Sequence, residues 1–285
     1  MSRIAYVNGR YLQQSAAAVS IDDRGFQFAD GVYEVCEVRG GKLVDERRHM
    51  ARLQRSLDLL RMERPMSVQS LAVVMRETIR RNRVSDGIVY VQVTRGEMRR
   101  DFPFPPASTP PTVVVTARAS NLAKIEAQAE IGISVITLPD ERWRHVDIKS
   151  VSLLPNVLAK QTARDRGARE AWLVDAQGRV TEGASSTAWI VTRDGVLVTR
   201  PLAGDILPGI TRSVLIDLIT AQGLRFEERA FTVEEAYAAR EAFITSASQA
   251  VMPVVQIDGR PVGNRAPGTA ASALRRDYHS QAEFT

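Results

Sequence analysis

Amines that could act as nucleophiles are scarce in this chain of 285 residues. Of its 38 basic residues 34 are Arg, and the four Lys are Lys42, Lys124, Lys149 and Lys160. Three of these Lys are expected in a hairpin turn, a polar connector and on a helix surface, where a solvated Lys is ordinary. A reaction that needs a lysine amine therefore has few candidates.

Lys149 differs from the other three because its neighbours are apolar. The segment HVDIKSVSLLPNV places Ile148 before it and Val151 and Leu153 after it. A Lys in such a segment must reach solvent, form an ion pair, or stay neutral in a desolvated pocket. The neutral amine is the nucleophile of Schiff-base chemistry. From this pattern alone, an ion pair with Asp147 or another neighbour is the simpler interpretation.

Imidazole and thiol groups are too few for a metal site. The chain has one Cys, at position 36, and three His, at positions 49, 145 and 279. A single Cys excludes an internal disulfide framework and a multi-Cys zinc site. The His are far apart and form no HExxH motif. We expect no bound metal.

The composition is that of a globular protein, with 44% hydrophobic and 25% charged residues. The net charge is +5, but no aromatic-interleaved basic stripe or nucleic-acid motif accompanies it, so we expect no nucleic-acid partner. No apolar run approaches the ~18 residues of a membrane span, and the start does not resemble a signal peptide. With a single thiol, these features predict a cytoplasmic protein without a membrane partner.

The residues that could do chemistry must be positioned by a mixture of helices and strands. In the first half, strands are expected at 4–7, 11–12, 32–38, 43–44, 87–94 and 112–118, and helices at 47–62 and 67–81. The proline-rich loop at 103–111 excludes regular structure. In the second half, strands are expected at 132–138, 170–175, 179–182, 187–192, 196–199, 242–246 and 251–257, and helices at 156–166, 209–222 and 267–280.

These elements lack a regular βαβ alternation, which favours an α+β fold over a doubly wound sheet. We predict an N-terminal α+β domain over 1–118, a polar and partly helical connector over 119–131, and a C-terminal α+β domain over 132–285 that carries Lys149.

Six motifs resemble, in order, those of the fold-type IV (class IV) pyridoxal-phosphate aminotransferases. They are DRGFQFADGVYEV (23–35), HMARL (49–53), RWRHVDIKSVSLLPNVLAKQ (142–161), VTEGASSTAWIV (180–191), LPGITR (207–212) and, more loosely, FITSASQAVMPV (243–254). Because they extend over nearly the whole chain, the sequence is identified as a member of this family, most similar to its D-amino-acid aminotransferases. The resemblance implies the family's two-domain fold and pyridoxal 5′-phosphate as cofactor.

The resemblance also implies cofactor-binding residues. Lys149 would form the Schiff base and then transfer the substrate proton. Glu182 matches the carboxylate that keeps the pyridine nitrogen protonated, and Arg52 matches the arginine that binds the phosphate. Taken alone, Glu182 would be a surface carboxylate beside a turn glycine and Arg52 a solvated helix arginine.

Further phosphate ligands are expected at the start of a helix. Gly209, Ile210 and Thr211 would present free N–H groups and the positive end of the helix dipole. Thr211 would add its hydroxyl, although by itself it would be an ordinary cap. In the family, another hydroxyl comes from the loop matching Ser246-Ala247-Ser248. Ala247 stands where relatives often carry Thr, so Ser246 or its neighbour would have to replace that contact.

Substrate binding is implied by VYVQVTRGEMRRDFPFP (89–105). It resembles the carboxylate-recognition segment of the D-amino-acid enzymes, which ends in Arg, one residue and His. Arg100 fits the Arg, Phe102 occupies the His position, and Tyr33 matches a tyrosine that binds the same carboxylate. Phe102 predicts looser carboxylate binding, by ~1 kcal/mol, and suggests broader substrate use that reaches (R)-amines. Ordinary packing beside Pro103 explains Phe102 equally well.

In the family the Arg-bearing loop crosses the dimer interface. The resemblance therefore implies a symmetric homodimer with active sites at the interface, in which Arg100 serves the partner's site. The expected reaction is ping-pong transamination between a D-amino acid, such as D-alanine, and a 2-oxo acid.

Three alternatives remain beside this function. Branched-chain aminotransferases share the lysine and phosphate motifs, but Tyr90 stands where their carboxylate-binding Arg aligns. Aminodeoxychorismate lyase has the same fold, and no feature of this sequence favours its elimination reaction. A cofactor-free binding protein is disfavoured because Lys149, Glu182, Arg52 and Thr211 are all retained.

Overall fold

A computed structural model describes residues 3–285, which form two compact units. Unit 1 comprises the chain up to Leu122 together with Ile148–Ser152 and Glu283–Thr285, and unit 2 comprises Ala123–Asp147 and Leu153–Ala282. Met1 and Ser2, which the predicted N-terminal domain includes, lie outside the described residues. Within residues 3–285, no helix is long and apolar enough to cross a bilayer.

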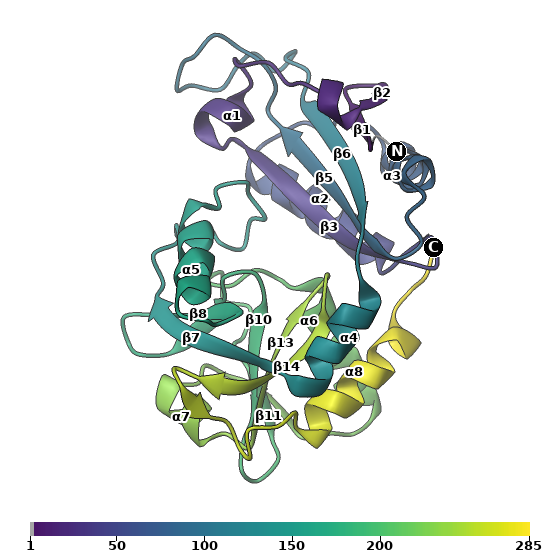
Figure 1. The fold of residues 1–285 in the computed structure, drawn as a ribbon. Helices are drawn as coiled ribbons and strands as arrows, with labels where there is room; N and C mark the ends of the chain where they lie inside the picture. Colours follow the sequence, from purple (N-terminus) through teal and green to yellow (C-terminus); the bar gives the residue numbers. More distant parts are fainter. Residues whose placement is uncertain (1–2) are drawn as a thin grey trace. The chain divides into compact units, whose positions relative to one another are not determined.

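Unit 1 is built on a six-stranded antiparallel sheet in the order β2-β1-β6-β5-β3-β4 (Figure 1). Its elements are β1 (Ile4–Val7), β2 (Arg10–Gln13), the 3-10 turn η1 (Gln14–Ala16), α1 (Arg24–Phe28), β3 (Gly31–Arg39), β4 (Lys42–Leu43), α2 (Glu46–Leu59), α3 (Val68–Asn82), β5 (Gly87–Thr94) and β6 (Thr112–Ala119).

Helices α2 and α3 cover one face of this sheet. Alternation along β3 buries Val32, Cys36 and Val38 in one apolar cluster with Leu53 of α2 and Met75 of α3. Complete burial of each such aliphatic side chain contributes roughly 1.5–3 kcal/mol. The opposite face of β3 and β5 is only half-buried within unit 1, and it carries polar and aromatic side chains.

Unit 2 is built on a mixed nine-stranded sheet in the order β12-β11-β10-β13-β14-β7-β8-β9, with β15 beside β14. Its elements are α4 (Leu122–Ile131), β7 (Ile133–Pro139), α5 (Leu154–Asp165), β8 (Glu170–Val174), β9 (Val180–Gly183), β10 (Thr187–Val191), β11 (Leu197–Thr199), α6 (Ile210–Ala221), β12 (Phe226–Glu228), α7 (Val233–Ala238), β13 (Glu241–Ser246), β14 (Ala250–Ile257), β15 (Arg260–Pro261) and α8 (Thr269–Gln281).

Both faces of this second sheet are buried at its centre. Trp189 and Phe243 pack against α6 and α8, whereas Ile190 and Ile244, the next residues on the same strands, belong to the cluster on the other face. Strands buried on both faces have uninterrupted apolar sequences, which explains why TAWIV and AFIT lack alternation.

The predicted α+β class is confirmed, and the longer elements agree with prediction to within a few residues. The loop at 103–111 contains no helix or strand, as predicted. Most of the predicted connector is the regular helix α4. Helix α5 begins at Leu154, two residues before its predicted start, because Pro155 is tolerated in a first turn.

One predicted assignment needs correction, because Lys149 does not group with the C-terminal unit. The segment Ile148–Ser152 belongs to unit 1, where it pairs with the free edge of β3. The amide of Tyr33 donates to the carbonyl of Lys149 at 2.9 Å, and the amide of Val151 donates to the carbonyl of Gly31 at 3.0 Å. Backbone pairing thus overrides position along the chain.

Candidate active site

Lys149 is fixed on both sides within unit 1. Besides its pairing with β3, its backbone amide donates to the hydroxyl of the buried Ser56, on α2, at 3.2 Å. The preceding Ile148 is buried in the apolar cluster. The side chain of Lys149 is half-buried, and its Nζ lies 4.3 Å from the centre of the Tyr33 ring. The amine is therefore held over an aromatic face, close to where its backbone is anchored.

Tyr33 belongs to a small aromatic and polar surface on β3 and β5. Its ring stacks on Tyr90, with 5.6 Å between the ring centres, and the Tyr90 hydroxyl donates to Gln92 Oε1 at 2.7 Å. Burial, together with the nearby Tyr33, raises the pKa of Tyr90 to about 12, so this hydroxyl remains a hydrogen-bond donor at neutral pH. Tyr33 and Lys149 are the two predicted site residues that meet on this surface.

Arg52 lies on α2, one turn before Ser56, and it contacts a carboxylate that sequence analysis missed. Its Nε is 2.7 Å from Glu34 Oε1 and its Nη2 is 2.9 Å from Glu34 Oε2. His49 Nδ1 is 2.8 Å from the same Oε2. All three side chains are buried. Arg52 is thus a buried and oriented guanidinium, not the solvated helix arginine of the simpler interpretation.

The protonation states in this cluster follow from burial and charge. Burial alone would raise the pKa of Glu34, but the charge of Arg52 and the hydrogen bonds from Arg52 and His49 hold this pKa well below its usual range. Burial also lowers the pKa of His49, and Glu34 offsets only part of that effect. Because an ionised carboxylate only accepts hydrogen bonds, Nδ1 of the neutral His49 must carry the proton.

Arg100 and Phe102 lie on a loop of unit 1 beside α1. The Arg100 guanidinium lies over the Phe28 ring at 4.6 Å, and the Phe102 ring centre is 5.5 Å from that of Phe28. Phe102 is 81% exposed, so packing inside the loop does not account for it. The structure brings both residues to Phe28 of α1. Their described contacts do not include Tyr33, Tyr90 or Lys149.

Arg24 fixes the backbone of this loop. Its Nη1 donates to the carbonyls of Asp101 at 2.6 Å and Pro103 at 3.2 Å, and its Nη2 donates to the carbonyl of Phe102 at 3.2 Å. Its Nε pairs with Asp30 at 2.8 Å. Arg24 is itself buried. A single guanidinium therefore binds three successive carbonyls next to Arg100.

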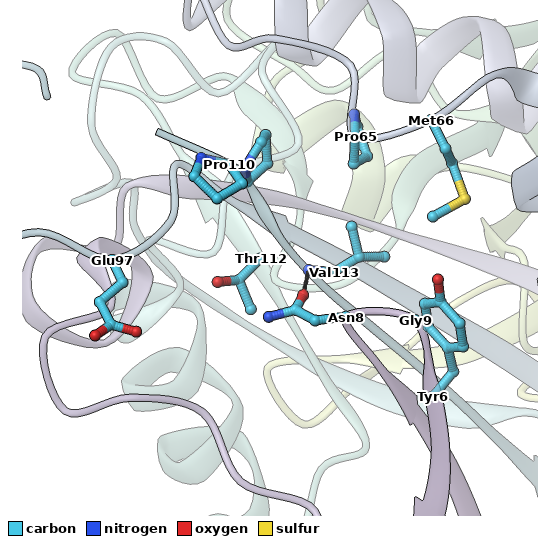
Figure 2. A pocket seen from close by; sticks show the side chains of 10 residues that line it. Tyr6, Asn8, Gly9, Pro65, Met66, Glu97, Pro110, Thr112 and Val113 are labelled. Carbon is cyan, nitrogen blue, oxygen red and sulfur yellow. Dashed lines mark hydrogen bonds between the residues drawn. The ribbon is translucent and has the colours of Figure 1, made fainter. Parts of the chain in front are cut away.

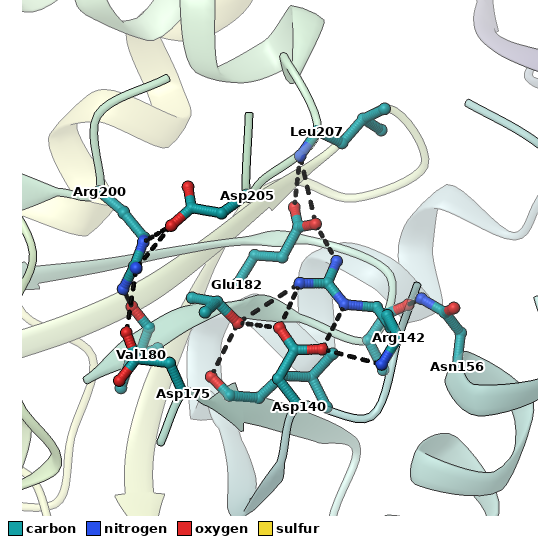
Figure 3. Close-up of polar contacts among 12 residues, drawn as sticks. Asp140, Arg142, Asn156, Asp175, Val180, Glu182, Arg200, Asp205 and Leu207 are labelled. Atoms are coloured by element: carbon teal, nitrogen blue, oxygen red, sulfur yellow. Dashed lines mark hydrogen bonds and ion pairs between the residues drawn. The ribbon is translucent and has the colours of Figure 1, made fainter. Parts of the chain in front are cut away.

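Glu182 lies on β9 of unit 2 and forms an ion pair with Arg142 Nη1 (Figure 3). The amide of Leu207 also points at this carboxylate, 3.2 Å from Oε1 and 3.3 Å from Oε2. Arg142 is held in turn by Asp140, with Nε 2.8 Å from Oδ1. Burial works against the charged form of Arg142, but Asp140 and Glu182 outweigh it and raise its pKa.

The start of α6 lies two residues beyond Leu207. Gly209 is the N-cap and has no side chain with which to cap the helix. A Cβ on Gly209 would lie 2.9 Å from the Thr187 hydroxyl, so a larger residue would displace the helix start. Thr211 is buried in the first turn. The first amides of the helix therefore have no side-chain cap, as an anion site requires.

Ser246 and Ala247 lie at the turn between β13 and β14, which begins with the register pair Ser246 and Ala250. Residue 245, at the end of β13, is paired with Thr187, the same residue that limits the space at Gly209. This turn, the start of α6 and Glu182 are therefore gathered at one end of the unit 2 sheet. All the predicted cofactor-binding residues of unit 2 belong to this group.

A hollow in unit 1 lies elsewhere. It has a volume of about 540 Å³, and Figure 2 shows it lined by Tyr6, Asn8, Gly9, Pro65, Met66, Glu97, Pro110, Pro111, Thr112 and Val113. Asn8 Oδ1 is occupied because it accepts from the amide of Val113 at 2.7 Å. The hollow contains none of the predicted site residues. Among residues 3–285, no three His, Cys, Asp or Glu side chains are arranged to bind a metal ion.

Residues 31–257 match the family model for class IV amino-transferases. The chain belongs to this family. It is 41% identical over 261 residues to a D-alanine aminotransferase of Bacillus licheniformis, covering 92% of this chain and 90% of that protein. It is 37% identical over 279 residues to a D-alanine aminotransferase of Staphylococcus haemolyticus, covering 98% and 97%.

Solved structures of branched-chain aminotransferases share the fold. A branched-chain aminotransferase of the archaeon Thermoproteus uzoniensis superposes with a TM-score of 0.86 at 26% identity, covering 98% of this chain and 94% of that one. Another branched-chain amino acid aminotransferase, solved with pyridoxamine 5′-phosphate, superposes with a TM-score of 0.89 at the same identity and coverage. The predicted family and fold type are therefore confirmed.

Four residues that hold the candidate site residues in place were not predicted. Glu34 and His49 orient Arg52, Arg142 pairs with Glu182, and Arg24 fixes the Arg100 loop. One signal was available for Glu34, a charged residue at a core-facing position of an alternating strand. A second signal was the i, i+3 spacing of His49 and Arg52, which places both side chains on the same face of one helix.

Proposed function

We propose that this class IV enzyme is a pyridoxal-phosphate-dependent aminotransferase that exchanges an amino group between a D-amino acid, such as D-alanine, and a 2-oxo acid in a ping-pong cycle. The observation that carries this proposal is its similarity to D-alanine aminotransferases over nearly the whole chain. Amino acids and 2-oxo acids are its substrates.

The residues present fit the cofactor. A phosphate needs fixed positive charge and unsatisfied N–H groups, which a buried Arg52 and an uncapped helix start at Ile210 and Thr211 offer. Ser246 and the amide of Ala247 would add donors at the neighbouring turn. Bound pyridoxal phosphate supplies a protonated ring that withdraws electrons from the substrate Cα.

Each remaining role falls to a residue of the chain. Lys149 Nζ would hold the cofactor covalently and, when released, would move the proton from the substrate Cα. Glu182 would accept a hydrogen bond from the pyridinium N–H, and its ion pair with Arg142 orients the carboxylate for this role. Tyr33 binds the substrate carboxylate from the aromatic surface beside Lys149.

We further propose a symmetric homodimer in which Arg100 binds the substrate carboxylate in the partner's site. Support comes from apolar side chains exposed on and near the Arg100 loop, which are Ile21 at 77%, Phe26 at 73% and Phe102 at 81%. Such side chains mark an interaction surface when they are grouped. We also expect a cytoplasmic location.

An alternative is a branched-chain aminotransferase, which the structural neighbours include. Tyr90 argues against it, because its hydroxyl is used by Gln92 and its ring lies on Tyr33. A further alternative is an (R)-amine transaminase, which the apolar and exposed Phe102 favours because it supplies no polar contact to a carboxylate.

One spectroscopic experiment separates these functions. The purified protein, loaded with pyridoxal phosphate, should lose the visible band of the lysine-bound cofactor when D-alanine is added. L-Alanine and L-leucine should leave the band unchanged. Bleaching by L-leucine alone would establish the branched-chain alternative, and faster bleaching by (R)-1-phenylethylamine than by D-alanine would establish the amine alternative.

Replacement of Lys149 tests the covalent attachment. Lys149→Ala should abolish the band, whereas the matched control Lys160→Ala should keep it, because the Lys160 amine pairs with Glu170 at 3.2 Å. A normal band in Lys149→Ala would disprove the lysine assignment.

A further inference from the structure

Thr187, the first residue of β10, carries a hydroxyl group that has no hydrogen-bond partner within residues 3–285. The residue is only 4% exposed. Neighbouring hydroxyls are used. Ser186 Oγ donates to Glu170 at 3.0 Å, and Thr245 Oγ1, opposite Thr187 on β13, accepts from Trp189 Nε1 at 3.1 Å. Buried polar side chains nearly always have a partner, so the free hydroxyl of Thr187 calls for an explanation.

The Thr187 hydroxyl borders the start of α6. Residues two apart on a strand share a face, so Thr187 lies on the same side of the sheet as Trp189, which packs against α6 and α8. A Cβ added to Gly209, the N-cap of α6, would lie 2.9 Å from Thr187 Oγ1 and 3.8 Å from the amide nitrogen of Arg212. The hydroxyl and a first-turn amide therefore adjoin one position, which the glycine leaves without a side chain.

The backbone does not require a glycine at position 209. Its φ of −65° and ψ of 130° are accessible to any residue. In many helices an N-cap Ser, Thr, Asp or Asn fills this position and accepts from the first-turn amides. The N-cap of α6 has no side chain to do so, and Thr187 does not take over, because its hydroxyl makes no hydrogen bond to these amides. Hydroxyl and amides are therefore donors that face a position without an acceptor.

The charges of this helix start also favour an anion. Acidic residues are common in the first turn of a helix, where they offset the positive end of the helix dipole, but the first turn of α6 has none. It carries the buried Arg212 instead, whose Nη2 donates to the carbonyl of Arg200 at 3.0 Å and pairs with the exposed Glu228 of β12. The turn itself thus supplies positive charge and no carboxylate.

We propose that Thr187 is a further phosphate-binding residue, and that its hydroxyl donates to an oxygen of the cofactor phosphate at the start of α6. This inference rests on the proposed function, because it takes the start of α6 as the phosphate site. It adds a residue of β10 to the donors proposed at Ile210, Thr211 and Ser246. The phosphate supplies the acceptor that the Thr187 hydroxyl lacks within the protein.

Ligands with and without a phosphate isolate this contact. Pyridoxal phosphate and pyridoxal can both react with a lysine amine, but only the first has a phosphate. Pyridoxine 5′-phosphate has the phosphate and no aldehyde, so its binding does not depend on Lys149. Dissociation constants for all three are measured on the full-length apoprotein by absorbance and fluorescence titration. The readout is the dissociation constant of pyridoxal divided by that of pyridoxal phosphate, because a general structural defect would weaken both ligands together.

Thr187→Val should lower this ratio about 10- to 100-fold, the usual effect of losing a hydrogen bond to a charged group, and should weaken pyridoxine 5′-phosphate to the same extent. Thr187→Ser keeps the hydroxyl and should retain most of the affinity. The matched control is Thr220→Val at the other end of α6, where the hydroxyl donates to the carbonyl of Ile216 at 2.8 Å, and it should leave the ratio unchanged. The Tm of the Thr187→Val apoprotein should not fall, because the lost hydroxyl has no partner in the protein.

The inference is wrong if Thr187→Val leaves the ratio unchanged, or if Thr187→Ser lowers it as far, since shape and not the hydroxyl would then matter. Should Thr187→Val fail to fold, Thr187→Ala removes the same hydroxyl and decides. If neither aldehyde forms the lysine-bound band with the wild-type protein, the proposed function fails, and the constants for pyridoxine 5′-phosphate still test Thr187. If the wild-type protein binds pyridoxal as tightly as pyridoxal phosphate, the start of α6 is no phosphate site, and the inference fails while the assignment of Lys149 stands.

Discussion

At the scale of single residues, three charged side chains in and near the predicted site are held by partners of opposite charge. Arg52 is held by Glu34, Glu182 by Arg142, and Arg24 by Asp30. In each pair at least one side chain is a guanidinium, whose planar fork fixes the orientation of a carboxylate better than an ammonium does. This gives a structural use to part of the excess of Arg over Lys in the chain.

The cluster around Glu34 makes stability depend on pH. The pKa of His49 in the folded state lies below its ordinary value of 6.5, so the unfolded chain binds more protons as the pH falls below that value. This contribution to stability is fully present above pH 6.5 and is lost as the pH falls toward the folded pKa. Glu34 behaves in the same way below its ordinary value of 4.5.

We therefore expect the Tm of the apoprotein to fall by a few degrees between pH 6.5 and 5.5, since one proton contributes at most about 1.4 kcal/mol per pH unit. His49→Asn should flatten this part of the curve. The control His145→Asn, at an exposed position, should show the same fall in Tm as the wild-type protein. A His49→Asn curve parallel to that of the wild-type protein would show that His49 is not the titrating group. Calorimetry between pH 5 and 8 measures all three.

Candidate site residues could be named from the sequence where a family motif contains them, but their partners in the structure could not. Lys149, Arg52 and Glu182 follow from short contiguous motifs. Arg142 pairs with Glu182 across 40 positions and Glu34 pairs with Arg52 across 18. Such pairs depend on which strand faces which helix, and local periodicity does not contain that information.

At the scale of elements, the short helix α1 determines where the Arg100 loop lies. Asp23 caps α1 by accepting from the amide of Gly25 at 2.8 Å. The first residue of the helix is Arg24, whose guanidinium binds the carbonyls of residues 101–103. Since this loop has five prolines over 103–111 and no internal ladder, its conformation depends on such outside donors.

Arg24→Lys should therefore weaken substrate binding without affecting the cofactor. A lysine ammonium cannot reproduce the planar fork that binds three successive carbonyls. We expect KM for D-alanine to rise about tenfold, the effect of one or two lost charged hydrogen bonds, with an unchanged dissociation constant for pyridoxal phosphate. Arg99, which is exposed and precedes Arg100, gives a matched control. Arg99→Lys should leave KM for D-alanine unchanged. Equal KM values for wild type and Arg24→Lys would contradict this role.

Helices of twelve or more residues were predictable because their periodicity is strong, as in α2 and α3. The short helices α1 and α7 were missed, since five or six residues show too little of a 3.6-residue period. For α7 a local signal existed, because Thr232 and Glu235 form a capping box. Strand β12 has only three residues and is defined by its pairing with β11.

At the scale of the whole molecule, neither compact unit is a single continuous stretch of the sequence. Two later segments return to unit 1. Ile148–Ser152 adds to β3, and the last residues pair with β4, where Leu43 and Thr285 exchange hydrogen bonds of 2.9 and 3.0 Å. Both segments are short and carry no strand pattern of their own. A division of the sequence into contiguous domains could not have included them.

The proposed homodimer makes a prediction about shared sites. If Arg100 serves the partner's site, Lys149→Ala and Arg100→Ala are each inactive as homodimers. A mixed dimer has one complete site, made by Lys149 of one protomer and Arg100 of the other, and one site that lacks both. Random exchange makes half of the dimers mixed, so about a quarter of the sites should regain activity. Unfolding and refolding the variants together, followed by a D-alanine assay, measures this. If Arg100 acts within its own protomer, every site lacks one residue and mixing restores nothing.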